Sequence, residues 1–377
     1  MKVALFYHSL VSDWNHGNAH FLRGVASELQ ARGHDVRIFE PENSWSRENL
    51  LQDRGPEALA AFEQAFPNLT SARYSPHAFN REKWLDGINL DGIDLVLVHE
   101  WNEPQVVAAL GAYRRWNPHI RVLFHDTHHR ALTAEHELSR FDLSNYDGVL
   151  AYGASLKRAY ENRGWGRQVH VWHEAADTRI FYPREKFRAL GDVVWIGNWG
   201  DEERTQELRE YFLTPVCNLK LTAQVYGVRY PPAALHELGA CGISYGGWLP
   251  NFEVPEVFAG FRATVHVPRR PYTRELPGIP TIRPFEALAC GIPLISAPWR
   301  DEENLFRVGH DFLMAQNRDE MQCLVRDVLH DEALAASLAE SGLETIRARH
   351  TCAHRVDELL GLFAEIAPRE LREEVHA

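Results

Sequence analysis

The sequence predicts an α/β protein built from two doubly wound domains. Its 377 residues exceed the size at which a single hydrophobic core usually stops growing. Short apolar runs alternate with amphipathic stretches along the whole chain, which is the pattern of parallel strands joined by helices. This alternation is interrupted once, at residues 173–187, which contain Pro183 and show no clear periodicity. We interpret that segment as a hinge between the two domains.

The first half alternates strands and helices in a regular order. Its first long helix is expected to end before Gly33, because a glycine after Arg32 suits the left-handed residue that closes a helix. Residues 41–90 form a longer, more polar insertion with helices of its own. The first domain is therefore assigned to residues 1–175. Its expected strands are residues 2–8, 36–40, 94–99, 121–125, 148–152 and 170–173, and its expected helices are residues 18–32, 56–66, 104–116 and 154–163.

A second alternating series supports a second domain over residues 188–350, followed by a C-terminal helix within residues 351–377 that we expect to pack back on the first domain. In sheets of this kind, ligands bind beyond the carboxyl ends of the strands. The expected strands are residues 192–197, 224–228, 242–247, 263–267, 293–297 and 311–315. The expected helices are residues 202–212, 232–239, 255–261 and 282–290, two more within 318–349, and a last one over 354–371.

Charge and composition exclude several classes of protein. The formal net charge is −12 at pH 7, which disfavours general binding to nucleic acid or to an anionic membrane. An anionic ligand would therefore need a local cluster of arginines or lysines. The apolar run at the N-terminus is too short for a signal peptide and is expected to form a strand. No apolar stretch is long enough to span a membrane, so we expect a cytoplasmic protein.

The cysteines argue against a disulfide framework. There are five of them, Cys217, Cys241, Cys290, Cys323 and Cys352, and no pair has the Cys-x-x-Cys spacing. An odd count without paired spacing also argues against a zinc knuckle and fits a reducing compartment.

The segment at residues 265–296 contains the clearest candidate for a ligand site. It reads as strand, loop, helix, turn and strand, with Pro284 in the first turn of the helix and Gly291 just after its end. A helix N-terminus beside fixed cations binds phosphate groups through free N–H donors and the helix dipole. Glu286, one turn into the helix, is suited to accept hydrogen bonds from a ribose. The arginines of this segment, which face a single acid, Glu275, are Arg269, Arg270, Arg274 and Arg283. The alternative is a solvated basic loop followed by an ordinary helix.

Four motifs of the chain resemble CgeB-like bacterial glycosyltransferases of the GT-B superfamily, which are similar to the large glycosyltransferase group 1. They are RPFEALACGIPLIS, IGNWGDEERTQEL, HDTHH and HEAADTRIF. The resemblance covers nearly the whole chain and is strongest over residues 190–355. It implies a GT-B fold, in which two Rossmann-like domains face a central cleft and the second binds the nucleotide sugar. It further implies that Glu286 contacts the ribose and that Arg283 lies near the diphosphate.

One position departs from the pattern of the large retaining GT-B group. That group has two glutamates separated by seven residues in this motif, whereas here Gly278 stands eight positions before Glu286. Glu275 lies three residues earlier still. Whether the reaction retains or inverts configuration therefore stays open.

A second candidate segment follows the first expected strand of the second domain. There Gly197 and Asn198 would allow the backbone to approach a ligand closely. The resemblance places Arg204 where the family has a cation that neutralises the diphosphate. The alternative is a helix with an N-cap at Asp201 and ordinary surface charges.

The first domain supplies further candidates at the ends of its expected strands. In the family, the loop holding His16, Gly17 and Asn18 faces the donor, and His125 resembles a histidine that bonds the transferring sugar. His99, Glu100, Asp126 and Glu174 are further candidates for contacts with sugar or acceptor. The histidines and carboxylates of residues 125–136 also permit a zinc site or an ordinary polar loop. We expect no metal.

Together these features predict a hexosyltransferase-type enzyme that moves a sugar from a nucleoside diphosphate sugar to an unidentified acceptor, without a cofactor or a metal. The groups expected at the reaction centre are His125, Arg204, Arg283 and Gly17. The groups expected to bind the donor are Gly197, Asn198, Arg204, Arg274, Arg283, Pro284, Glu286 and Asn18. The alternatives are a sugar-nucleotide epimerase or a phosphorylase on the same fold, or a non-catalytic protein that binds nucleotide sugars.

Overall fold

The computed structural model describes residues 1–76, 88–185, 189–200 and 202–366. The chain divides into two units: residues 1–173 together with the segment from Cys352 onward form unit 1, and residues 174–351 form unit 2. No helix in the described part of the chain is long and apolar enough to cross a membrane. Asp201 and residues 367–371 of the expected last helix lie outside the described residues.

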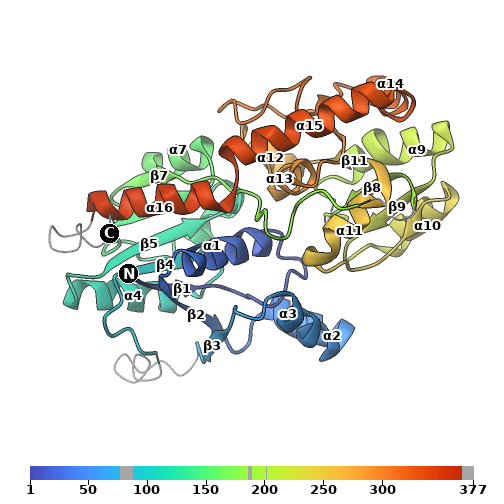
Figure 1. The fold of residues 1–377 in the computed structure, drawn as a ribbon. Coiled ribbons are helices and arrows are strands. Elements are labelled where there is room, and N and C mark those ends of the chain that lie inside the picture. Colours follow the sequence, from blue (N-terminus) through green and yellow to red (C-terminus); the bar gives the residue numbers. More distant parts are fainter. Residues whose placement is uncertain (77–87, 186–188, 201, 367–377) are drawn as a thin grey trace. The chain divides into compact units, whose positions relative to one another are not determined.

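Unit 1 contains a parallel sheet of seven strands in the order β3-β2-β1-β4-β5-β6-β7 (Figure 1). The central strands are apolar on both faces, and β4 and β5 are buried along their whole length. A strand of this kind suits a parallel sheet that is covered by helices on both sides. The strands are β1 Lys2–Phe6, β2 Asp35–Pro41, β3 Ser71–Tyr74, β4 Leu95–His99, β5 Arg121–Asp126, β6 Gly148–Ala151 and β7 Val169–Val171.

The C-terminal helix α16 completes unit 1 by packing against α1. Arg32, at the end of α1, forms an ion pair with Asp357 and donates to the carbonyl oxygen of Ala353 at 3.0 Å. Trp172 donates from its indole nitrogen to the carbonyl of Arg355 at 2.8 Å. The helices are α1 Ala19–Ala31, α2 Trp45–Arg54, α3 Glu57–Ala65, α4 Pro104–Trp116, α5 Arg130–Thr133, α6 Glu135–Leu138, α7 Ala154–Arg163 and α16 Cys352–Ile366.

Unit 2 contains a second parallel sheet, of six strands, in the order β10-β9-β8-β11-β12-β13. Its core includes Val193, Trp195, Val225, Ala263 and Ile295, which come from four adjacent strands. The strands are β8 Gly191–Ile196, β9 Ala223–Tyr226, β10 Ser244–Tyr245, β11 Phe261–His266, β12 Leu294–Ser296 and β13 Leu313–Met314. The structure therefore confirms two doubly wound α/β domains.

The helices of unit 2 include one irregular stretch. The expected helix over residues 202–212 begins at Thr205, turns into a π-helix and continues into α9. Pro215 explains this change, because it has no N–H to donate to the carbonyl four residues earlier. The helices are α8 Thr205–Leu208, η2 Arg209–Leu213, α9 Thr214–Leu219, α10 Pro232–Ala240, η3 Asn251–Glu253, α11 Val254–Ala259, α12 Arg270–Arg274, α13 Ile282–Ala289, α14 Arg318–His330 and α15 Glu332–Arg349.

The expected strands and helices are confirmed with shifts of a few residues at their ends. Gly33 takes a φ of +80° after α1, and Gly291 takes a φ of +63° after α13. Both are thus in the left-handed conformation expected of a glycine that ends a helix. The edge strand β3 was not expected. Its sequence, Ser-Ala-Arg-Tyr, is short, with two exposed residues and a single buried one, and such a segment carries little of the apolar signal by which a strand is recognised.

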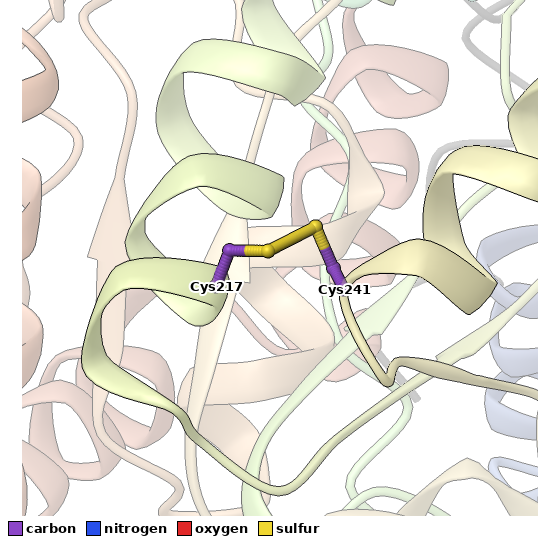
Figure 2. The surroundings of a disulfide bond; sticks show 2 residues. All are labelled: Cys217 and Cys241. Atoms are coloured by element: carbon purple, nitrogen blue, oxygen red, sulfur yellow. A yellow bond between two sulfur atoms is a disulfide. The ribbon is translucent and has the colours of Figure 1, made fainter.

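A disulfide joins Cys217 of α9 to Cys241 at the end of α10 (Figure 2). The expectation of no disulfide was therefore wrong for this pair. The two residues lie 24 positions apart, and their Cα atoms are 5.1 Å apart, because α9 and α10 flank the strand β9 that connects them. The other three cysteines, Cys290, Cys323 and Cys352, are free.

We expect this disulfide to stabilise unit 2. Closing a loop of this length removes conformational freedom from the unfolded chain and typically contributes ~2–4 kcal/mol. Cys217→Ser should lower the free energy of unfolding by about that amount in guanidinium titrations. Cys323→Ser, at a free and exposed cysteine, is the matched control and should change little. Equal stability of both variants would contradict the prediction.

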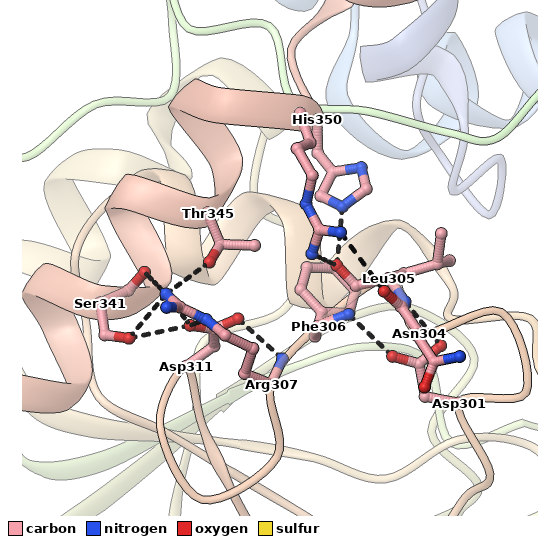
Figure 3. A network of polar contacts seen from close by, with 10 residues as sticks. Asp301, Asn304, Leu305, Phe306, Arg307, Asp311, Ser341, Thr345 and His350 are labelled. Atoms are coloured by element: carbon pink, nitrogen blue, oxygen red, sulfur yellow. Dashed lines mark hydrogen bonds and ion pairs between the residues drawn. The ribbon is translucent and has the colours of Figure 1, made fainter.

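The loop after β12 is fastened to α15 by a polar network (Figure 3). The buried carboxylate of Asp311 accepts hydrogen bonds from the backbone and guanidinium of Arg307 and from the hydroxyl of Ser341. Arg307 also donates to Thr345 at 2.9 Å. At the other end of the loop, His350 lies 2.8 Å from the carbonyl oxygen of Leu305. All these polar groups face protein partners, so we assign the network a structural role.

Candidate functional site

The strand order of unit 2 places a topological switch point between β8 and β11. From β8 the chain continues outward through β9 and β10, and from β11 it continues in the opposite direction through β12 and β13. At such a point the loops at the carboxyl ends of two neighbouring strands diverge and leave room for a ligand. These connections are residues 197–200 and 202–204 after β8, and residues 267–281, which include α12, after β11. Both belong to the segments that the sequence singled out.

Arg204 connects these two loops. Its guanidinium donates to the carbonyl oxygens of Asn198 at 2.5 Å and of Val267 at 3.0 Å, and it lies over the ring of Trp195. Burial, followed by the nearby charge of Arg269, lowers the pKa of Arg204 to about 9, so the group stays charged at neutral pH. The guanidinium has five N–H donors. Some of these donors join the segment after β8 to the segment after β11. The sequence did not predict this structural role.

Gly197 and Asn198 join the loops after β8 and β9. The carbonyl of Gly197 accepts from the hydroxyl of Tyr230 at 2.8 Å, and the side chain of Asn198 accepts from the backbone N–H of Val228 at 2.9 Å. A Cβ on Gly227 would stand 2.1 Å from the carbonyl oxygen of Gly197. The close approach expected at Gly197 is therefore made here by another loop of the protein.

The other arginines of the 265–296 segment have different surroundings from those expected. Arg269 pairs with Glu203 at 3.1 Å, and Arg270 donates to the carbonyl of Glu203 at 2.9 Å. Arg274 is exposed, as is Glu275, and within the described residues neither has an ion-pair partner. The single acid expected to face the arginines is thus not their partner, because the loop folds against the start of α8 instead.

Helix α13 begins at the switch point with its N-terminus uncapped. Thr281 occupies the N-cap position in an extended conformation, but its side chain makes no capping hydrogen bond. Pro284, the third residue of the helix, has no N–H, so Ile282 and Arg283 carry the free donors of the first turn. Free N–H groups and the positive end of the helix dipole favour an anion at this point.

Glu286 is fully buried and already has two protein partners. Its carboxylate accepts from the side-chain amide of Asn251 at 2.9 Å and pairs with the guanidinium of Arg283, which is 28% exposed. The expectation that Glu286 is open to a ribose was therefore incomplete. Asn251 was missed by the sequence analysis, because it lies 35 residues upstream in a segment without a motif.

The carboxyl edge of the sheet in unit 1 brings together several of the predicted residues. Asn18, after β1, donates from its amide to Nε2 of His99 at 2.9 Å and also to the hydroxyl of Thr127. Thr127 donates to Glu100 at 3.1 Å. Nε2 of His99 lies 2.8 Å from the carboxyl of Glu100. Residues that follow three different strands thus form one buried cluster, of which the sequence missed only Thr127.

Four histidine rings form a row through this cluster. The ring centroids of His8 and His16 are 5.6 Å apart, those of His16 and His99 are 5.7 Å apart, and those of His99 and His125 are 5.4 Å apart. Among the described residues, neither ring nitrogen of His16 or His125 has a hydrogen-bond partner, although both rings are buried. Burial lowers the pKa of all four, so they are neutral at pH 7. Buried polar atoms normally have partners, so these ring nitrogens are exceptions that make His16 and His125 candidates for ligand contact.

Two buried carboxyl groups in this cluster have raised pKa values. Burial raises the pKa of Glu100 to about 7. Burial and the neighbouring Glu100 raise the pKa of Asp126 to about 7, although Asp126 accepts hydrogen bonds from Tyr160 at 2.7 Å and from the backbone of His128. A carboxyl group that titrates near neutrality is suited to take up or release a proton during a reaction.

These carboxyl groups predict a dependence of stability on pH. Between about pH 4 and pH 7 they are protonated in the folded protein and ionised in the unfolded chain, so the folded state binds more protons and stability falls as the pH rises. Glu100→Gln should remove roughly 2.5 kcal/mol of that fall, measured as the difference in unfolding free energy between pH 5 and pH 8. An unchanged difference would contradict the raised pKa. Glu63→Gln, at an exposed position of α3 in unit 1, is the control.

Gly17 was expected at the reaction centre and Glu174 in contact with the sugar or the acceptor, and no metal was expected. Gly17 is exposed, and a Cβ placed on it would meet no atom within 4 Å. Glu174 is buried at the start of unit 2 and has protein partners of its own. Over the described residues, no group of three or more histidine, cysteine, aspartate or glutamate side chains is arranged to hold a metal ion.

Two family models match the chain, one in each half. Residues 17–180 match a model described as glycosyltransferase family 4, and residues 204–361 match a model described as glycosyl transferase-like. Each half of the chain is thus similar to a glycosyltransferase model. A search of curated proteins found no match.

Several solved glycosyltransferases share the fold. Anabaena HepE in complex with UDP and glucose is 14% identical, with a TM-score of 0.66, and the match covers 97% of this chain and 100% of that one. Sucrose-phosphate synthase from Thermosynechococcus elongatus is 15% identical, with a TM-score of 0.63 and coverage of 97% and 99%. T4 phage BGT in complex with UDP-glucose is 12% identical, with a TM-score of 0.60 and coverage of 97% and 99%. The fold of this chain is therefore that of the GT-B glycosyltransferases.

Proposed function

We propose that the protein is a glycosyltransferase that transfers a hexose from a UDP-sugar to an acceptor. The observation that carries the proposal is the switch point of unit 2, where Arg204, Arg283 and the uncapped N-terminus of α13 lie beyond the carboxyl ends of β8 and β11. These are the groups that stabilise a diphosphate as it leaves a sugar. Several structures with this fold contain UDP or a UDP-sugar, which is why we choose uridine as the base.

The histidine row of unit 1 supports a second part of the proposal. Sugars present many hydroxyl groups, each of which donates and accepts hydrogen bonds, and the unpaired ring nitrogens of His16 and His125 are suited to them. We propose that His125 binds the transferring sugar and that the Gly17 loop positions the same sugar. Glu100, with His99, is assigned to the acceptor hydroxyl, since its pKa near 7 allows it to receive a proton.

The finer assignments belong to the same proposal. The four motifs quoted above support a CgeB-like subgroup, and the proposal includes a cytoplasmic location. Glu174 and Asp126 are assigned to contacts with sugar or acceptor. A sugar-nucleotide epimerase or phosphorylase on this fold would use the same donor groups. A non-catalytic protein would bind the nucleotide sugar without turnover.

Binding of the donor tests the proposal most simply. A thermal-shift panel should show a rise in melting temperature with UDP and UDP-sugars, because a ligand that binds the folded state stabilises it by mass action. GDP, ADP and their sugars are the matched controls for the base. No shift with any nucleotide at millimolar concentration would contradict the proposal.

We also expect transfer to survive removal of divalent cations. The arginines and the helix N-terminus supply positive charge to the diphosphate without a metal. Turnover in EDTA should therefore equal turnover in buffer alone. If EDTA abolishes activity and Mg²⁺ or Mn²⁺ restores it, the metal-independent mechanism is wrong.

A further inference from the structure

His266, the last residue of β11, is buried near Arg204 and Arg283, the two arginines assigned to the donor. Nδ1 of its ring lies 2.9 Å from the hydroxyl of Ser296, and Nε2 lies 3.3 Å from the hydroxyl of Thr281. Burial, with the nearby charges of Arg204 and Arg283, lowers the pKa of His266 to about 3. The ring is therefore neutral at pH 7 and carries one proton.

The hydrogen bonds of Ser296 determine which nitrogen carries that proton. The hydroxyl of Ser296 donates to the carbonyl of Ala297 at 2.8 Å, so its oxygen must accept from Nδ1 of His266. Nε2 then has only a lone pair, and the hydroxyl of Thr281 must donate to it. A directed chain of hydrogen bonds thus runs from Thr281 through His266 and Ser296 to the backbone.

This chain and Pro284 together explain why α13 is uncapped: Pro284 lacks the N–H that an N-cap side chain would accept from at the third helical position, and the Thr281 hydroxyl lies 3.3 Å from His266. A threonine at the N-cap normally turns its oxygen toward the N–H groups of the first helical turn. Here Thr281 has the N-cap position but no capping bond, because its hydroxyl is directed to His266. The N–H groups of Ile282 and Arg283 have no acceptor among the described residues, and they remain available to an anion.

We propose that His266 is a positioning residue for the donor: it holds the Thr281 hydroxyl away from α13 and so keeps the first N–H groups of that helix free for the diphosphate. This inference rests on the proposed function, since it concerns the same donor site. It adds a group that contacts no substrate atom and acts through Thr281. Without His266, Thr281 would rotate and cap the helix, and the ligand would have to displace that contact.

The test is a double-mutant cycle with UDP as the probe, read by calorimetry. His266→Phe should weaken UDP binding by about five- to tenfold, the usual value of one cap expressed as affinity. Thr281→Val cannot cap, so it should leave the affinity within about a factor of two. The double variant should recover the affinity of Thr281→Val. His266→Gln, whose carbonyl can accept from Thr281, should bind nearly as well as the wild type.

Two results of this cycle would overturn the inference. Equal weakening in His266→Phe and in the double variant would show that His266 acts only through packing and would overturn the inference. A loss of more than about tenfold in Thr281→Val would mean that this hydroxyl contacts the diphosphate directly, which also overturns it. Thr281→Val keeps the test decisive if His266→Phe does not fold. Absence of UDP binding in the wild-type protein would instead contradict the proposed function.

Discussion

Replacing Arg283 with alanine is expected to lower kcat by about a hundred- to a thousandfold, the usual cost of removing one preorganised donor from a site that stabilises developing negative charge. The guanidinium lies in the first turn of α13, beside the free N–H groups, and it is 28% exposed, so it can reach a ligand. Its benefit should grow as the glycosidic bond breaks. The loss should therefore appear in kcat more than in KM.

Two variants separate this role from a general effect of charge. Arg283→Lys should recover only part of the rate, because lysine keeps the charge but loses the planar fork. Arg326→Ala, at an exposed arginine of α14, removes the same charge from the surface of the unit and should leave kcat unchanged. Near-normal kcat in Arg283→Ala with saturating donor would mean that the leaving group is held elsewhere.

Glu286→Gln is expected to weaken UDP binding by about tenfold or more. The substitution removes the charge-assisted hydrogen bond that orients Arg283, and a bond of this kind typically contributes ~1.5–3 kcal/mol. Glutamine keeps the contact with Asn251 but removes the negative charge that orients Arg283. Alanine would be a poorer test, since it would also leave the amide of Asn251 without this acceptor. Calorimetry measures the change on protein whose melting temperature has been checked.

Glu275→Gln is the matched control for this variant. Glu275 lies in the same segment but is exposed and outside the arginine pairs, so its loss of charge should leave UDP affinity unchanged. Equal affinity in Glu286→Gln and the wild type would remove Glu286 from the nucleotide site.

The architecture could be predicted from the sequence because it depends on local patterns. Alternating apolar runs and amphipathic stretches report strands and helices directly, and parallel strands bring their carboxyl ends to one edge of the sheet. For this reason Asn18, His99 and Glu100, which follow or end different strands, could be named together as candidates before their contacts were known. His266 also ends a strand, and the same signal could have identified it.

The partners of the site residues could not be predicted in the same way. The carbonyl of Val267 that Arg204 contacts lies 63 residues away in sequence, and the Asn251 amide that contacts Glu286 lies 35 residues away. Such contacts depend on how loops pack after the sheet has formed. The Cys217–Cys241 disulfide was missed for the same reason, since only the packing of α9 and α10 brings the two sulfur atoms together.

The central claim is that a sugar leaves UDP and joins an acceptor, and mass spectrometry of the products tests it most directly. The protein would be incubated with a UDP-hexose whose sugar carries ¹³C, together with a mixture of saccharide and peptide acceptors. We predict that the labelled hexose appears on an acceptor with an equal amount of free UDP, and that Arg283→Ala lowers the initial rate at which both products form by about a hundred- to a thousandfold. Labelled hexose that stays on UDP, whether unchanged or as an epimer, would contradict the account.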